Sequence, residues 1–313
     1  MEKSWVIAFR ALNLYLGFQQ RSWMRIVSYS VNDEKDYGFM VSKTEFVPRS
    51  FVEGVIGLDI PSDVKMLLPD DELKGLIEAA ITGVNVERIS IYSVHLDPPI
   101  PNPGKIICLG LNYADLAEEL GVEPPNGLPI VLKPNTAMTG PFDPILKPKI
   151  VKELDYEGEL AVVIGRRCRN VGEEEALGYV FGYMVLNDVS ARDIQFRDGQ
   201  WTRGKGFDSF APMGPYLVSA DEVGDPNDLK IVTRVNKEVR QKSSTSKMIH
   251  GVSSIVSQLS MNMTLEPGDI IATGTPAGVG YAIKPEPKFL KAGDIIEVWI
   301  ERIGVIRNEV IEE

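Results

Sequence analysis

The chain is built around the sequence Glu153-Leu-Asp-Tyr-Glu-Gly-Glu-Leu-Ala-Val-Val-Ile-Gly165. Its apolar run from Leu160 to Ile164 is partly β-branched and is bounded by a glycine, which predicts a buried strand. Glu157 and Glu159 stand two residues apart at the start of this strand. Because side chains of a strand alternate between its faces, both carboxylates are expected to point the same way.

A third carboxylate is predicted to join this pair. The apolar run from 180 to 186 predicts a second strand, and Asp188 lies at its end. Neighbouring carboxylates that enter a core repel one another and are costly to desolvate unless a cation lies between them. A site made only of oxygens is the kind that Mg²⁺ accepts. Acidic residues at strand starts are also commonly plain solvated ends, so the pattern by itself leaves both readings open.

Short blocks of sequence from Lys105 to the C-terminus point to a family. The blocks are Gly110-Leu-Asn-Tyr-Ala-Asp115, Leu132-Lys-Pro-Asn-Thr136, Asp155-Tyr-Glu-Gly-Glu-Leu160, Asn187-Asp-Val-Ser-Ala-Arg-Asp193, Gly204-Lys-Gly-Phe207 and Thr273-Gly-Thr-Pro-Ala-Gly278. In sequence and order they resemble the fumarylacetoacetate hydrolase family. The resemblance implies a homodimer and an α+β, mainly β fold with a mixed β-roll catalytic domain. It also implies a Mg²⁺ or Mn²⁺ cofactor held by Glu157, Glu159 and Asp188.

Lys205 is a candidate catalytic residue. It stands between Gly204 and Gly206, which let the backbone approach a ligand closely. A lysine near a metal is suited to stabilise an enolate or to bind a substrate carboxylate. In isolation it would be an ordinary solvated loop lysine. The resemblance places Lys205 in the active site.

Other substrate-binding candidates follow from the same resemblance. Thr275 matches a threonine that contacts the ligand in the family. Asn112 and Tyr113 match pocket-lining residues, with packing or helix capping as the alternative. Arg192 and Gln195 either contact the substrate or support the loop at the end of the strand.

The chain departs from the family at the residues that activate water. Members that hydrolyse carbon–carbon bonds carry a histidine and, three residues later, a glutamate on the helix after Asn-Tyr. Here these positions hold Leu116 and Glu119. A leucine cannot accept a proton, so Glu119 alone would have to act as the base. Neither His95 nor His250 matches the missing position.

The expected function is that of a metal-dependent enzyme for small 2-oxo or 1,3-dicarbonyl carboxylic acids. The metal is expected to act as a Lewis acid that favours an enolate. Leu116 favours isomerase or decarboxylase chemistry, resembling 2-hydroxyhepta-2,4-diene-1,7-dioate isomerases. Hydrolysis of the fumarylacetoacetate or acylpyruvate type is the alternative. A binding protein that kept the fold and lost catalysis is a further alternative, although the retained acidic cluster argues against it.

Composition excludes several classes of partner. The formal net charge is −11 and the isoelectric point is near 4.9, so nucleic acid and anionic membranes are not expected to bind. Cys108 and Cys168 form no metal-binding spacing, which favours a reduced, cytoplasmic compartment but leaves a disulfide open. The expected partner is therefore a small carboxylic acid substrate.

Three segments are expected along the chain. Residues 1–23 have no uninterrupted apolar run long enough for an anchor and no cleavage site, and we hypothesise that translation begins at Met24. If residues 1–23 are part of the protein, an amphipathic helix is expected there. Residues 24–100 are expected to form a small α+β domain with short strands and turns over 24–60 and a helix over 61–82. After the proline-rich stretch from Asp97 to Gly104, residues 101–313 are expected to form the catalytic domain.

Overall fold

The computed structural model describes residues 24–83 and 87–313. The predictions for residues 1–23 therefore lie outside the described residues. Strands predominate over helices in the described parts, which confirms the predicted α+β, mainly β fold. None of the described helices is both long and apolar enough to cross a membrane.

The strands and helices have the following bounds. The strands are β1 (Arg25–Val31), β2 (Glu34–Met40), β3 (Glu45–Pro48), β4 (Ile89–Ser90), β5 (His95–Asp97), β6 (Ile106–Leu109), β7 (Ile130–Lys133), β8 (Met138–Thr139), β9 (Ile145–Lys147), β10 (Leu154–Asp155), β11 (Gly158–Ile164), β12 (Val180–Asn187), β13 (Ser190–Ala191), β14 (Ala211–Ser219), β15 (Lys230–Val235), β16 (Glu238–Ser244), β17 (Ile270–Ala272), β18 (Ile295–Ile300) and β19 (Gly304–Glu312). The α-helices are α2 (Arg49–Ile56), α3 (Val64–Leu67), α4 (Asp71–Gly83), α5 (Ala114–Leu120), α6 (Glu173–Ala176), α7 (Arg192–Asp198), α8 (Trp201–Lys205), α9 (Ala220–Val223) and α10 (Val252–Asn262). The 3₁₀ turns are η1 (Ile91–Ser93), η2 (Asn135–Ala137), η3 (Leu177–Tyr179), η4 (Thr245–Lys247) and η5 (Gly280–Ala282).

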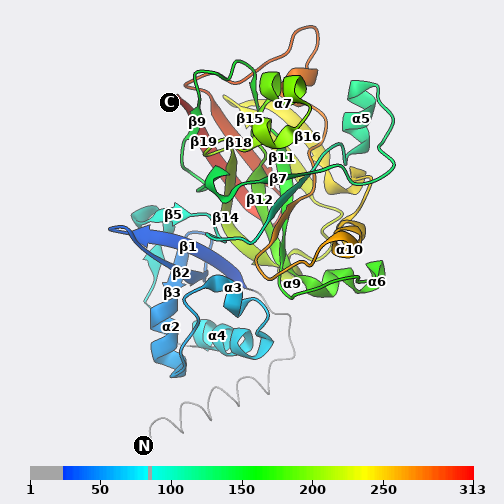
Figure 1. Cartoon of the computed structure of the whole chain (residues 1–313). Coiled ribbons are helices and arrows are strands. Elements are labelled where there is room, and N and C mark those ends of the chain that lie inside the picture. The colour runs from blue at the N-terminus through cyan, green and yellow to red at the C-terminus, as the bar shows by residue number, and fades with distance from the viewer. Residues whose placement is uncertain (1–23, 84–86) are drawn as a thin grey trace, which may run out of the picture.

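One large sheet runs through the molecule. Its main strand order is β4-β3-β2-β1-β14-β12-β11-β17-β6-β7, with β5 on β1 and β8 on β14. The N-terminal strands extend this sheet, because β1 pairs antiparallel with β14. A second sheet of order β16-β15-β18-β19-β9 lies in the upper part of Figure 1, and helices α2 to α4 lie below β1 to β3.

Both faces of the central strand β11 are buried. Leu160, Val162 and Ile164 belong to a core cluster that also contains residues of the five-stranded sheet. Ala161 and Val163 point the other way, into a cluster that includes residues of α2, α3 and α4. This alternation explains why the strand is apolar throughout: neither face meets water.

Two local expectations were wrong. Within 24–60, residues Arg49–Ile56 form α2 rather than strands and turns, and this helix ends at Gly57 in the left-handed conformation. The helix expected over 61–82 is split into α3 and α4. Pro69 lies in the break, where its ring and missing N–H prevent one helix from running through.

Two further expectations concern the two cysteines and the bounds of the domains. Cys108 and Cys168 are both free and buried, so they form no disulfide. The bounds of the domains at 23/24 and 100/101 stay a prediction.

Candidate metal centre

The register of β11 and β12 brings the three predicted carboxylates together. Gly158 lies opposite Asn187 in this antiparallel pair, so Asp188 follows directly beside Glu157. The Asp188 N–H donates to the Glu157 carbonyl at 2.9 Å. Carboxylate oxygens of Glu157, Glu159 and Asp188 lie within 4.8 Å of one another, and all three side chains are buried. The three acids therefore form a compact group that could hold a metal ion.

Cationic side chains surround the group. The Lys205 ammonium lies 3.0 Å from Glu157 Oε2 and 2.6 Å from Asp188 Oδ2. Lys133 donates to the other oxygen of Asp188, Oδ1, and to the Val189 carbonyl. The second oxygen of Glu157, Oε1, is 2.6 Å from Arg192 Nη2. Both oxygens of Glu157 and of Asp188 are thus paired with a cation.

Glu159 is different, because one of its oxygens has no partner. Its Oε2 accepts from the Gly274 N–H at 2.7 Å. Its Oε1 is buried and has no hydrogen-bond partner among the described residues. An unsatisfied carboxylate oxygen in the interior is unfavourable by itself, and a cation bound to it would remove the penalty. The donor set contains only carboxylate oxygens, which suits Mg²⁺ or Mn²⁺.

The two innermost acids have pKa values shifted in opposite directions. Burial and the charges of Asp188 and Glu157 raise the pKa of Glu159 well above its usual value. Burial also opposes ionisation of Asp188, but Lys133 and Lys205 outweigh it and lower the pKa of Asp188 to about 2. The surroundings therefore oppose ionisation of Glu159 and favour ionisation of Asp188.

Lys205 lies at the C-terminal end of α8 and is buried, unlike the solvated loop lysine considered from the sequence. It also donates to Ser190 Oγ at 2.8 Å. Burial tends to lower its pKa, but Asp188 and Glu157 outweigh that effect and raise it. Lys205 is therefore a fixed positive charge rather than a base at neutral pH.

Lys133 is a buried cation of the centre that lies within the sequence block 132–136. Lys133 is the last residue of β7 and lies on the same face of that strand as Val131, two residues earlier. Val131 belongs to the core cluster that also contains Ala161. This alternation places Lys133 on the face of the sheet where the acids lie. A lysine at a core-facing strand position was the signal available in the sequence, since lysine is rarely fully buried without a partner.

Arg192 and Gln195 support the centre from α7. Arg192 Nε bonds Asp155 Oδ2 at 2.9 Å, and its Nη1 donates to Gln195 Oε1 at 3.0 Å. Asp155 in turn accepts the backbone N–H groups of Gly280 and Tyr281. The structure thus gives these two side chains internal partners, and it adds Asp155, which lay in a sequence block without a role, as a further supporting residue.

Asn112, Tyr113 and Thr275 are all buried near the same centre. The Asn112 side chain joins two loops, because it donates to the carbonyls of Thr273 and His250. Thr275 Oγ1 donates to the Gly158 carbonyl at 2.9 Å. Gly158 lies between Glu157 and Glu159 in the sequence. Their contacts with substrate stay a prediction.

Leu116 and Glu119 both lie on α5, to the right of the sheets in Figure 1. Leu116 is buried in a small apolar cluster with Tyr113, Val279 and Ala282. Glu119 is exposed, and its Oε2 accepts from the Gly278 N–H at 2.8 Å.

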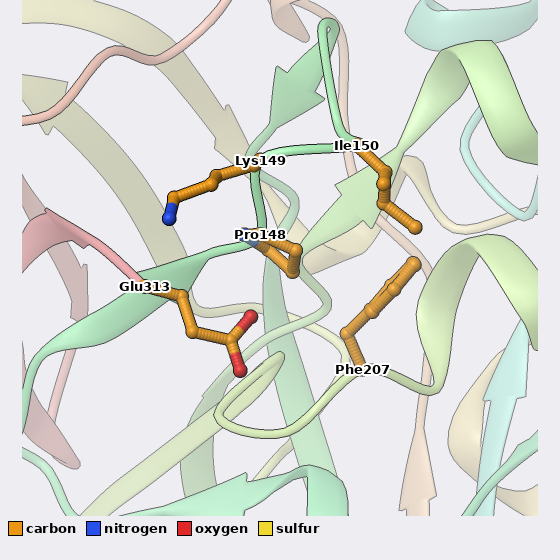
Figure 2. A pocket seen from close by; sticks show the side chains of 5 residues that line it. All are labelled: Pro148, Lys149, Ile150, Phe207 and Glu313. Atoms are coloured by element: carbon orange, nitrogen blue, oxygen red, sulfur yellow. The ribbon is translucent and has the colours of Figure 1, made fainter.

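A surface pocket of about 490 Å³ lies beside the C-terminal end. It is lined by Pro148, Lys149, Ile150, Phe207 and Glu313, and Figure 2 shows Ile150 and Phe207 pointing toward each other. Phe207 comes two residues after Lys205, but none of the three clustered acids lines the pocket. The three acids are therefore not part of the wall of this pocket.

Comparison with known proteins gives consistent matches. A family model described as fumarylacetoacetate (FAA) hydrolase C-terminal matches residues 105–311. Oxaloacetate tautomerase YisK from Bacillus subtilis is 46% identical over 226 residues, which are 71% of this chain and 74% of that protein.

Solved structures cover nearly the whole chain. A 2-hydroxyhepta-2,4-diene-1,7-dioate isomerase from Mycobacterium marinum has a TM-score of 0.72 at 35% identity, covering 93% of this chain and 99% of its own. A maleylpyruvate hydrolase from Sphingobium sp. SYK-6, in complex with manganese (II) ion and pyruvate, has a TM-score of 0.76 at 34% identity, covering 92% and 99%. Together with the family model, these matches show that the chain belongs to the fumarylacetoacetate hydrolase family.

Proposed function

We propose that the chain is a Mg²⁺- or Mn²⁺-dependent enzyme that enolises small 2-oxo or 1,3-dicarbonyl carboxylic acids, with isomerisation or tautomerisation as its main reaction. The observation that carries the proposal is the buried group of Glu157, Glu159 and Asp188, in which Glu159 Oε1 lacks a partner. A divalent cation held there would act as a Lewis acid toward the oxygens of a bound 2-oxo acid.

The charges of the centre support an anionic substrate. Four buried carboxylates face three buried cationic side chains, namely Asp155, Glu157, Glu159 and Asp188 against Lys133, Lys205 and Arg192. With all of them ionised, the group carries one excess negative charge. A bound dication would reverse that sign, so the loaded site would attract a carboxylate.

Lys205 supplies a fixed positive charge for enolisation of the substrate. Its ammonium contacts Glu157 and Asp188 and stays charged, so it can offset negative charge that develops on a substrate oxygen. Tautomerisation removes a proton from the carbon beside the keto group and returns one to the keto oxygen. The composition of the substrate does not change, and no water is consumed.

Leu116 favours this reaction over hydrolysis. Hydrolysis of a carbon–carbon bond consumes one water, which must be deprotonated, and the apolar side chain at position 116 cannot take that proton. The names of similar proteins include a tautomerase and an isomerase. Decarboxylation of a 2-oxo acid that carries a second carboxylate beta to its keto group also gives an enolate, by loss of CO₂ in place of a proton, and is compatible with the site.

Carbon–carbon hydrolysis is the second candidate. The maleylpyruvate hydrolase covers this chain as fully as the isomerase does, and Glu119 is present on α5. It requires Glu119 to activate water without a histidine beside it.

One set of assays tests the proposal. The purified protein is given oxaloacetate, an acylpyruvate and a hydroxydienedioate in parallel, with Mg²⁺, with Mn²⁺ and with a chelator. We expect metal-dependent tautomerisation or isomerisation to exceed cleavage. Acylpyruvate cleavage faster than any isomerisation would favour the hydrolase, and turnover that persists after complete metal removal would refute the metal-dependent mechanism.

The assembly and location are proposed from the family resemblance and the composition. We propose a homodimer in the cytoplasm that binds a small carboxylic acid and neither nucleic acid nor membranes, consistent with the acidic composition. Light scattering coupled to gel filtration tests the dimer, since a monomeric mass would contradict it.

A further inference from the structure

Residues 273–282, which we call the strap, are hydrogen-bonded to the segment 155–159 that carries two of the three acids. The Gly274 N–H donates to Glu159 Oε2 at 2.7 Å, and the Thr275 hydroxyl donates to the Gly158 carbonyl at 2.9 Å. Further along, the Gly280 N–H donates to Asp155 Oδ1 at 2.7 Å. An element that packs on the strap is therefore connected to Glu159 through a few hydrogen bonds.

Helix α5 docks on the strap through two carboxylates. Asp115 Oδ1 accepts the Ala277 N–H at 3.3 Å, and Glu119 Oε2 accepts the Gly278 N–H at 2.8 Å. Gly278 has a φ of +99°, and a Cβ there would meet the Arg240 carbonyl oxygen at 2.0 Å. Only glycine fits this conformation, so the N–H that Glu119 receives is presented by a specialised turn.

Leu116 forms the apolar part of the same docking contact. It shares a cluster with Tyr113, which precedes α5, and with Val279 and Ala282 of the strap. Leu116 and Glu119 therefore face the strap together, one through packing and one through a hydrogen bond.

We propose that Glu119 is a positioning residue and not a base: it accepts the Gly278 N–H and, together with the packing of Leu116, holds α5 against the strap beside Glu159. This inference rests on the proposed function and deepens it. Glu119 acts as a hydrogen-bond acceptor for Gly278, not as a base. Position 119 requires a side-chain oxygen that accepts a hydrogen bond, and the amide of glutamine also provides one.

The central test compares two substitutions of Glu119. Glu119→Gln keeps an acceptor oxygen and removes the ability to take a proton, whereas Glu119→Ala removes both. We expect Glu119→Gln to keep kcat/KM for oxaloacetate tautomerisation within about threefold of the wild type, with an unchanged pH profile. Glu119→Ala is expected to lower kcat/KM about tenfold through loss of one charge-assisted hydrogen bond.

Hydrogen exchange supplies a readout that does not depend on turnover. Backbone amides of peptides covering 277–278 are expected to exchange about tenfold faster in Glu119→Ala and at the wild-type rate in Glu119→Gln. Glu118→Ala is the matched control, because Glu118 is exposed on the same helix and its loss changes the charge equally. It is expected to behave like the wild type in both measurements.

The outcomes separate the two proposals. Suppose that Glu119→Gln loses activity, or loses the acidic limb of the pH profile, while its hydrogen exchange is unchanged. That result would identify Glu119 as a base and overturn the inference. Unchanged exchange in Glu119→Ala would also overturn it. If the wild type turns over none of the substrates, the proposed function fails, and the exchange data still decide whether Glu119 holds the strap.

Discussion

Replacing Glu159 with glutamine is expected to stabilise the metal-free protein and to abolish its response to Mg²⁺. Glu159 is fully buried, and its Oε1 has no hydrogen-bond partner among the described residues. Glutamine has the same shape, and its amide oxygen can still accept from the Gly274 N–H. It removes the charge that two neighbouring carboxylates oppose.

The expected size follows from the desolvation penalty of a buried carboxylate. The uncharged amide avoids part of this penalty, worth about 1–3 kcal/mol, so Glu159→Gln should raise the melting temperature in chelator by about 2–6 °C. For the wild type, Mg²⁺ at about one hundred times its dissociation constant should add nearly 3 kcal/mol, or about 5 °C. Glu159→Gln should show almost none of this increase, because it lacks the third anionic ligand.

The pH dependence has a definite sign. The pKa of Glu159 is raised in the folded protein, so the stabilisation from its protonated form is present at low pH and is lost as the pH rises through that raised value. The metal-free wild type should therefore lose stability with rising pH relative to Glu159→Gln. Mg²⁺ should remove the difference in slope, because a bound dication favours the ionised carboxylate.

Differential scanning fluorimetry at several pH values, with Mg²⁺ and with chelator, measures all of these effects. Asp269→Asn is the matched control, since Asp269 is also fully buried and its Oδ1 likewise lacks a partner among the described residues. Asp269 is paired with Lys105 at 2.6 Å, so its substitution should destabilise the protein and leave the Mg²⁺ response intact. A Glu159→Gln protein that is less stable than the wild type in chelator, and still gains stability from Mg²⁺, would refute the metal centre.

Two further predictions concern residues around the centre. Lys133→Met removes a buried partner of Asp188, so it should lower the free energy of unfolding in chelator by about 3 kcal/mol, measured by urea denaturation. An unchanged free energy would mean that Lys205 alone is a sufficient partner for Asp188. Leu116→His places a proton acceptor three residues before Glu119, so product analysis should show a higher ratio of acylpyruvate cleavage to oxaloacetate tautomerisation. A folded variant with an unchanged ratio would show that position 116 does not set the reaction.

The local sequence pattern was sufficient to predict the two strands beside which the three acids lie. The apolar runs around Leu160 and Val185 are buried on both faces, so their sequences contain a signal that does not depend on distant partners. The same rule misled over 24–60, where a short helix carries several β-branched residues. Glu157, Glu159 and Asp188 could be grouped because strand parity and strand ends are readable one strand at a time.

The sequence by itself determined that Glu157 and Glu159 share one face of a strand and that Asp188 follows the end of another, since alternation along a strand is a local property. Only the tertiary structure decided which cations accompany them. Lys133 comes from β7, which is separated from β11 by β17 and β6, and Glu119 meets a glycine 159 residues away. Such pairings depend on strand order and loop closure over long separations, which no periodicity in the chain encodes.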